Sequence, residues 1–145
     1  GCFMSDELPP DGPEQGKMYV LNLGKSSNPE TMNGTHWTCV FNGRNNSIIY
    51  FDPFGAPPSE SILKWLKKTK VPGQSYRKPI VYNTIQLQDI DSSTCGYFCC
   101  YMLNRLCKGN SFLNVLMDGG MDHFKKYLND RLVKKIQERN YFDRV

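Results

Sequence analysis

The sequence lacks several features that would assign it quickly. Its 145 residues contain no apolar run near the ~20 residues that a membrane-spanning helix needs. The first residues, GCFMSDELPPDG, are acidic and rich in proline, so they do not resemble a secretory signal peptide. No internal repeat or low-complexity segment occurs. These absences predict neither a membrane partner nor secretion, and they exclude repeat and fibrous architectures.

A strong charge of one sign is also missing. The formal net charge is +4, with 39% hydrophobic and 22% charged residues, which is ordinary for a globular protein. The length suits one compact domain, residues 1–145, with a core of its own. Because the sequence starts with Gly1 in place of Met, we expect this domain to be trimmed at its N-terminus.

Some of the basic residues form three short groups. These are Lys67, Lys68 and Lys70, then Lys125 and Lys126, then Lys134 and Lys135. Such groups usually form solvated faces of helices, and contact with a polyanion such as nucleic acid is the other interpretation. No nucleic-acid-binding motif accompanies them, so both interpretations stay open.

The six cysteines are too few for a scaffold held together by disulfides. In the segment DSSTCGYFCC, Cys99 and Cys100 are adjacent, which is poor geometry for a bond between them. Without a secretory signal, reduced thiols and an intracellular location are expected. The spacing of Cys95, Cys99 and Cys100 also lacks the paired ligands of a zinc site. No metal and no other cofactor is predicted.

Alternating β-branched and aromatic residues predict strands, and the segments are 18–23, 36–41, 47–52 and the β-rich stretch 79–88. Residues 1–16 and 25–35 have the composition of turns and loops. Asn42 and Gly43 are a hairpin signal between two of the strands. If the turn centres on Arg44, residues whose numbers sum to 88 lie opposite each other.

Three helices are expected. Ser59 is a plausible N-cap for a short helix that buries Ile62, Leu63, Trp65 and Leu66. From Cys95, apolar residues recur with helical spacing at 95, 98, 99, 102, 103 and 106, and Gly109 ends the series. Ser92, Ser93 and Thr94 are its candidate caps. A third amphipathic helix is expected after Gly119 and Gly120.

Cys95 differs from the other cysteines in its position. A cysteine on the apolar face of a helix usually fills the core, and this is the prediction for Cys39, Cys99, Cys100 and Cys107. Cys95 instead starts the helix, where backbone N–H groups and the helix dipole stabilise a thiolate and an oxyanion beside it. Gly96 leaves room for a substrate backbone. A nucleophile and a core residue are both open readings at this point.

A nucleophilic cysteine needs a base, and only His36 and His123 exist. His123 lies in the charged C-terminal segment, where a solvated surface role is expected. His36 begins a strand, and the hairpin arithmetic places it opposite Asp52, at the end of the partner strand. A carboxylate there can orient an imidazole and stabilise its charged form. Alternatively, His36 is a strand-edge histidine and Asp52 a strand cap.

Four segments in order resemble the adenovirus-type, or adenain-like, cysteine proteases. They are GTHWTCVF, YFDPFGAPP, the glutamine segment IQLQ and DSSTCGYFCC. The opening GCFMSDELP is also similar to adenain-like proteases of Polinton-type elements and virophages. The resemblance covers about residues 2–107. It implies an α+β, papain-like fold of the adenain/SUMO-protease clan, with a central mixed sheet flanked by helices and the nucleophile at a helix N-terminus.

The resemblance also implies roles for particular residues. Cys95 corresponds to the nucleophile, His36 to the general base and acid, and Asp52 to the orienting acid, where adenoviruses have Glu. Gln88, seven residues before Cys95, corresponds to the side-chain donor of the oxyanion hole, with Gln86 as the rival. Gly96 and Trp37 are expected to contact substrate.

The function expected from this resemblance is a cysteine endopeptidase that cleaves viral capsid or other structural precursor proteins during virion maturation. Cleavage at glycine or small residues, a location in the virion and the infected-cell interior, and nucleic acid as an activator are further expectations. A ubiquitin- or SUMO-type isopeptidase of the same clan is the alternative enzyme. A non-catalytic binding module and a nucleic-acid-binding protein are alternatives of another class.

Overall fold

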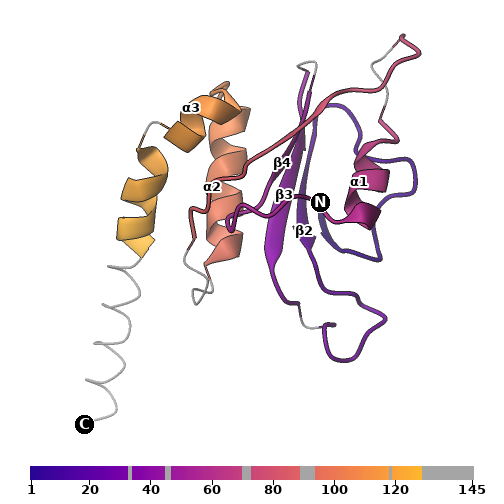
Figure 1. Ribbon diagram of the computed structural model, residues 1–145, viewed down its shortest axis with the longest axis horizontal. Helices are drawn as coiled ribbons and strands as arrows, with labels where there is room; N and C mark the ends of the chain where they lie inside the picture. The colour runs from indigo at the N-terminus through magenta and orange to yellow at the C-terminus, as the bar shows by residue number, and fades with distance from the viewer. Residues whose placement is uncertain (33, 45–46, 70–72, 89–93, 118, 129–145) are drawn as a thin grey trace.

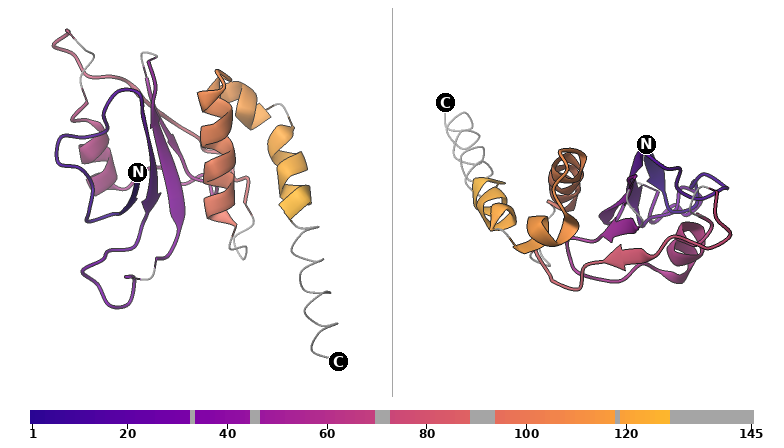
Figure 2. Two further views of the ribbon diagram at one scale, coloured as in Figure 1. Left: turned by 180° about the vertical axis from the view of Figure 1, so that it is seen from behind. Right: turned by 90° about the horizontal axis from the view of Figure 1, so that it is seen from above.

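The computed structural model describes residues 1–128 except 33, 45–46, 70–72, 89–93 and 118. A sheet forms the middle layer, with helix α1 (Glu60–Leu66) on one face and helix α2 (Cys95–Cys107) on the other (Figure 1). Helix α3 (Phe112–Met117) lies at the C-terminal end of α2. Residues 120–128 are helical and lie on the side of α2 away from the sheet (Figure 2).

The sheet has five strands in the order β1-β2-β3-β4-β5. They are β1 (Cys2–Met4), β2 (Lys17–Asn22), β3 (Trp37–Asn42), β4 (Ile48–Phe51) and β5 (Ile80–Tyr82). The three central strands are antiparallel, whereas each edge strand pairs in parallel with its neighbour. The predicted mixed sheet flanked by helices is therefore confirmed.

The register of the β3–β4 hairpin differs from the prediction. Paired residues sum to 90, as in Cys39 with Phe51, instead of 88. The turn is therefore longer than Asn42 and Gly43 alone suggest. Because the shift is two residues, every side chain stays on its predicted face of the sheet. His36 and Asp52 still lie at the same end of the sheet, immediately before β3 and immediately after β4.

Helix α1 covers the first face of the sheet. Ser59 is its N-cap, as predicted, and its hydroxyl oxygen accepts the N–H of Ile62. The helix buries Ile62, Trp65 and Leu66, while Leu63 is only partly buried. These side chains pack on alternate residues of the central strands to form one of the two apolar clusters. This cluster covers the face of the sheet opposite to the one that carries α2 and Cys95.

Helix α2 covers the second face, mainly over β3. All six of its predicted apolar positions are buried, namely Cys95, Phe98, Cys99, Met102, Leu103 and Leu106. Phe112 of α3, with Met121 and Leu128 of the last helical segment, completes the same cluster. This second core holds the first turn of α2 against the start of β3, and so determines where Cys95 lies.

Some predictions about local structure were wrong. Residues 2–4 form an edge strand, although 1–16 were expected to be turns. The β-rich stretch 79–88 supplies only the three residues of β5. Cys100 and Cys107 are exposed instead of buried, because they face the open side of α2 over β2 and β1. The predicted C-terminal helix is present to residue 128, and its continuation lies outside the described residues.

None of the helices in the described part of the chain is long and apolar enough to cross a bilayer.

Candidate active site

The ring of His36 is paired with Asp52. His36 Nε2 lies 2.7 Å from Asp52 Oδ1, and because a carboxylate only accepts, Nε2 is the donor. The two side chains are 12% and 2% exposed, so little water competes for the bond. The predicted pairing of these residues is confirmed. With Nε2 committed to Asp52, Nδ1 is the ring nitrogen left for proton exchange with another group.

Asp52 is held by its own turn and by a buried asparagine. Its Oδ1 also accepts the backbone N–H of Phe54 at 2.8 Å, and its carbonyl accepts the N–H of Gly55 at 2.8 Å. The side chain of Asn83 binds the backbone of Asp52 at both of its polar groups. Its Oδ1 accepts the Asp52 N–H at 3.1 Å, and its Nδ2 donates to the Asp52 carbonyl at 2.6 Å. The carboxylate therefore has a fixed direction before any substrate is present.

Cys95 is the first residue of α2 and is 6% exposed. The backbone N–H of Trp37 donates to its Sγ at 3.4 Å, and one turn later the Cys99 thiol donates to the carbonyl of Trp37 at 3.5 Å. These two hydrogen bonds hold the first turn of α2 against Trp37, the residue that follows His36. Across the described residues, no hydrogen bond joins the His36 ring directly to Cys95 Sγ. Such bonds are often formed only when substrate binds.

Cys99 has a different character from Cys95. It is fully buried, and burial, together with the neighbouring Cys39 thiol, raises its pKa well above the ordinary value. Cys99 therefore stays a neutral thiol at physiological pH. Cys39 is buried beside it, and its thiol donates to the Cys99 carbonyl at 3.8 Å. Both fill the core, as predicted.

The two candidate glutamines differ in burial. The side chain of Gln88 is 1% exposed, whereas Gln86 is exposed and uses its amide to donate to the Gln88 carbonyl at 2.9 Å. Although the β-rich stretch 79–88 was predicted as strand, residues 85–88 are not part of one. The Pro53 carbonyl accepts the N–H groups of Leu87 and Gln88 at 2.8 and 2.9 Å. The turn that carries Asp52 therefore also positions the backbone of Gln88.

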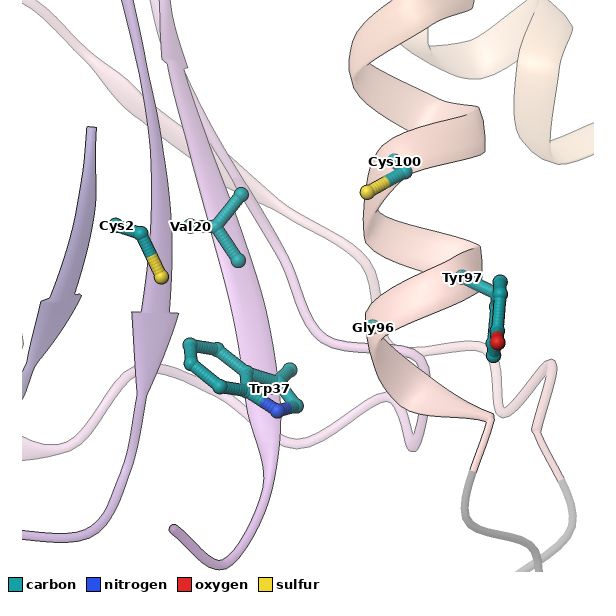
Figure 3. A pocket seen from close by; sticks show the side chains of 6 residues that line it. All are labelled: Cys2, Val20, Trp37, Gly96, Tyr97 and Cys100. Atoms are coloured by element: carbon teal, nitrogen blue, oxygen red, sulfur yellow. The ribbon is translucent and has the colours of Figure 1, made fainter. Parts of the chain in front are cut away.

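A mostly apolar pocket of about 330 Å³ is lined in part by Trp37 and Gly96, which directly follow His36 and Cys95 in the sequence. Figure 3 shows Trp37 and Val20 on the sheet facing Gly96 and Cys100 on α2, with Cys2 and Tyr97 completing the lining. A Cβ atom added at Gly96 would meet the Trp37 ring at 3.6 Å, which is an ordinary contact. The fold itself therefore does not require glycine at position 96, and Gly96 contributes no side chain to the pocket. Trp37 and Gly96, the two residues expected to contact substrate, both line this pocket.

Sequence reasoning missed Pro53, Phe54 and Asn83, which hold the site residues through main-chain contacts and ring stacking. The PFG letters after Asp52 were the only signal for two of them. His123, the other histidine, is exposed on the last helical segment, which lies on the side of α2 away from the sheet. No group of three or more metal-ligating side chains occurs in the part of the chain that the structure describes.

The fold is similar to that of the ASFV pS273R protease. Its selenomethionine crystal structure gives a TM-score of 0.52 at 20% sequence identity, covering 72% of this chain and 41% of that chain. A second crystal structure of that protease gives 0.50 at 17% identity, with coverages of 69% and 37%. This chain thus spans about two fifths of the length of that protease. No protein-family model and no curated protein matches the sequence.

The likeness establishes the architecture. At these identities it confirms the predicted α+β fold, with helices on both faces of a mixed sheet. The protein therefore shares its fold with a protease, and it carries a buried cysteine, a histidine–aspartate pair and a buried glutamine on neighbouring parts of that fold.

Proposed function

We propose that this protein is a cysteine endopeptidase of the adenain-like type, with Cys95 as nucleophile, His36 as general base and acid, and Asp52 as the orienting acid. The observation that carries the proposal is the hydrogen bond from the Trp37 N–H to Cys95 Sγ. This bond holds Cys95, the first residue of α2, next to Trp37. Trp37 in turn directly follows His36, the histidine paired with Asp52.

The proposed reaction begins with proton transfer from Cys95 to His36 Nδ1. The thiolate attacks the scissile carbonyl, and the oxyanion accepts hydrogen bonds from the Gln88 amide and the Cys95 N–H. The C–N bond then breaks as the imidazolium protonates the leaving amine. Water, deprotonated by His36, releases the acyl group and restores the thiol. Asp52 keeps the imidazole oriented and stabilises its charged form throughout.

The proposed substrates are viral capsid or other structural precursor proteins, cleaved at glycine or small residues in the virion and the infected-cell interior. The similarity to the ASFV pS273R protease supports a protein substrate. Gly96 has no Cβ, so the backbone of a substrate could pass close to α2 opposite Trp37, which supports substrates with glycine or small residues at the cleavage site. Nucleic acid is the proposed activator, and the exposed Lys67 and Lys68, which directly follow α1, are candidate contacts for it.

The test combines labelling with cleavage. Iodoacetamide at neutral pH should label Cys95 stoichiometrically and abolish cleavage of candidate capsid precursors, with new termini identified by mass spectrometry. Cys95→Ala should be inactive, and Cys107→Ala, which removes an exposed thiol elsewhere on α2, should behave as wild type. Cleavage by purified Cys95→Ala would refute the assignment.

Ubiquitin- and SUMO-based probes test the alternative enzyme. Covalent capture of either probe by Cys95, without cleavage of structural precursors, would replace the proposed substrate class and keep the nucleophile. Absence of both labelling and cleavage would favour a non-catalytic binding module.

A further inference from the structure

The imidazole of His36 lies on the face of another ring. The centroids of His36 and Phe54 are 4.2 Å apart, and the two ring planes differ by only 11°. This is a stacked pair, in which the Phe54 ring lies against one face of the imidazole. Phe54 is half-buried, so it shields that face from water without being part of the main core.

The backbone of Phe54 acts on the same pair. Its N–H donates to Asp52 Oδ1, which is the oxygen that also accepts from His36 Nε2. Phe54 thus orients the acid with its main chain and covers the imidazole with its side chain. The two contacts are separable by mutation, because a change of side chain leaves the N–H in place.

The observed hairpin register explains why these residues meet. Continued beyond β4, pairs that sum to 90 place Phe54 opposite His36. Residues 52–55 form a turn closed by the bond from the Gly55 N–H to the Asp52 carbonyl, and within this turn the Phe54 ring lies nearly parallel to the imidazole. Stacking is therefore a consequence of the hairpin and of the Asp52 turn together.

We propose that Phe54 is a positioning residue for His36, and that its ring holds the imidazole with Nδ1 toward Cys95 and stabilises the imidazolium form. The role in proton transfer to Cys95 rests on the proposed function, whereas the effect on the imidazole does not. A hydrogen bond at Nε2 fixes one atom of the ring but leaves the tilt of its plane free. A stacked wall removes that freedom, and its negative π-face favours a charged ring over a neutral one.

Phe54→Leu removes the aromatic face and retains the backbone contact to Asp52. Iodoacetamide alkylation of Cys95, measured between pH 5 and 9, should slow by roughly 3- to 10-fold at neutral pH, the range expected for loss of one stacked pair. For cleavage, kcat should fall by a similar factor with little change in KM, because Phe54 does not line the pocket. Phe54→Tyr should restore both rates.

A matched control separates this effect from general loss of packing. Phe124 of the last helical segment also stacks on an aromatic ring, that of Tyr101, at 4.6 Å and 19°. Phe124→Leu should lower stability without changing the pH profile of Cys95 alkylation.

The stacking can also be measured directly by NMR on the imidazole protons. With only two histidines, His123→Gln assigns the imidazole NMR signals. The ring current of Phe54 should move the His36 ring protons upfield of those of His123, and Phe54→Leu should return them.

The outcomes distinguish this inference from the proposed function. Slow alkylation in Phe54→Leu, with no cleavage by any form of the protein, supports the inference and refutes the peptidase. Normal cleavage and alkylation in a folded Phe54→Leu, or unshifted His36 protons in the wild type, overturns the inference and leaves the peptidase intact.

Discussion

Asp52 can be tested separately from the fold because an amide has nearly the same shape. In Asp52→Asn the side-chain oxygen can still accept the N–H of Phe54, so the turn should survive. A neutral amide cannot stabilise an imidazolium, and turnover should fall roughly 10²–10⁴-fold. The measurement is cleavage rate beside the thermal unfolding midpoint.

The control is Asp6→Asn, which removes another hydrogen-bonded carboxylate, the one that accepts from Ser26 and Ser27. It should leave turnover unchanged. Equal losses in the two variants would show that the charge of Asp52 has no special role.

Gln88 and Gln86 provide a second comparison between single residues. Charge develops on the carbonyl oxygen only as sulfur attacks, so a fixed donor helps the transition state more than the bound substrate. Gln88→Ala should lower kcat about 10²–10³-fold with little change in KM, and alkylation of Cys95 should stay fast. Gln86→Ala should do much less, since its exposed side chain supports only the Gln88 carbonyl.

A large loss of turnover in Gln86→Ala, with little loss in Gln88→Ala, would mean that Gln86 is the donor. If neither variant is impaired, the oxyanion hole has no side-chain donor from this segment.

Residue types and spacing were enough to predict the pairing of His36 with Asp52, but not what surrounds them. The order of the residues places both at one end of a hairpin, whatever the exact turn. The stacking of Phe54, by contrast, depends on a register that the letters Asn42 and Gly43 do not fix. The hydrogen bonds between Asn83 and Asp52 join residues 31 positions apart, and no local sequence pattern predicts such a contact.

At the scale of elements, the turn at residues 52–55 is the most constrained piece of the site. Gly55 has φ +76°, and a Cβ there would lie 2.8 Å from the carbonyl carbon of Ile85. Gly55→Ala should therefore push the 85–88 segment away from Pro53, lowering turnover as well as stability. Cleavage rate and urea unfolding of the same sample test this.

Gly16→Ala is the matched control, since Gly16 has φ +78° but nothing within 4 Å of an added Cβ. It should cost about 1–2 kcal/mol from backbone strain alone and leave turnover intact. A Gly55→Ala enzyme with normal turnover would show that the glutamine segment does not depend on this turn.

The elements themselves were predictable to different degrees. Helix α2 was found from its spacing because one stripe of it is buried along its whole length. Strand β1 was missed because a parallel edge strand depends on its partner β2 and not on a local turn. The stretch 79–88 looked like a long strand, but it leaves the sheet after Tyr82, where Asn83 turns to bind Asp52.

At the scale of the whole molecule, two buried acidic groups make a contribution to stability that is lost at high pH. Burial raises the pKa of both Tyr50 and Cys99. In the unfolded chain these groups lose protons near their ordinary values of 10.0 and 9.0, while the folded protein keeps them. The unfolded state therefore binds fewer protons, and the free energy of unfolding should fall as the pH rises above about 9.

Urea unfolding between pH 7 and 11 measures this slope. Tyr50→Phe should flatten it above pH 10, whereas Tyr76→Phe should not, because Tyr76 is 59% exposed and meets water in both states. An unchanged slope in Tyr50→Phe would contradict the prediction.

The two hydrogen bonds to the Pro53 carbonyl have a consequence for how such a chain can vary in length. One residue inserted or deleted between Asp52 and Gly55 would displace the carboxylate, the aromatic ring and the glutamine segment in a single event. The same change in the loop 25–32 would be absorbed, since Asn22 Oδ1 anchors Thr35 just ahead of His36. Over evolutionary time, insertions and deletions should accumulate in that loop and be purged from residues 52–55.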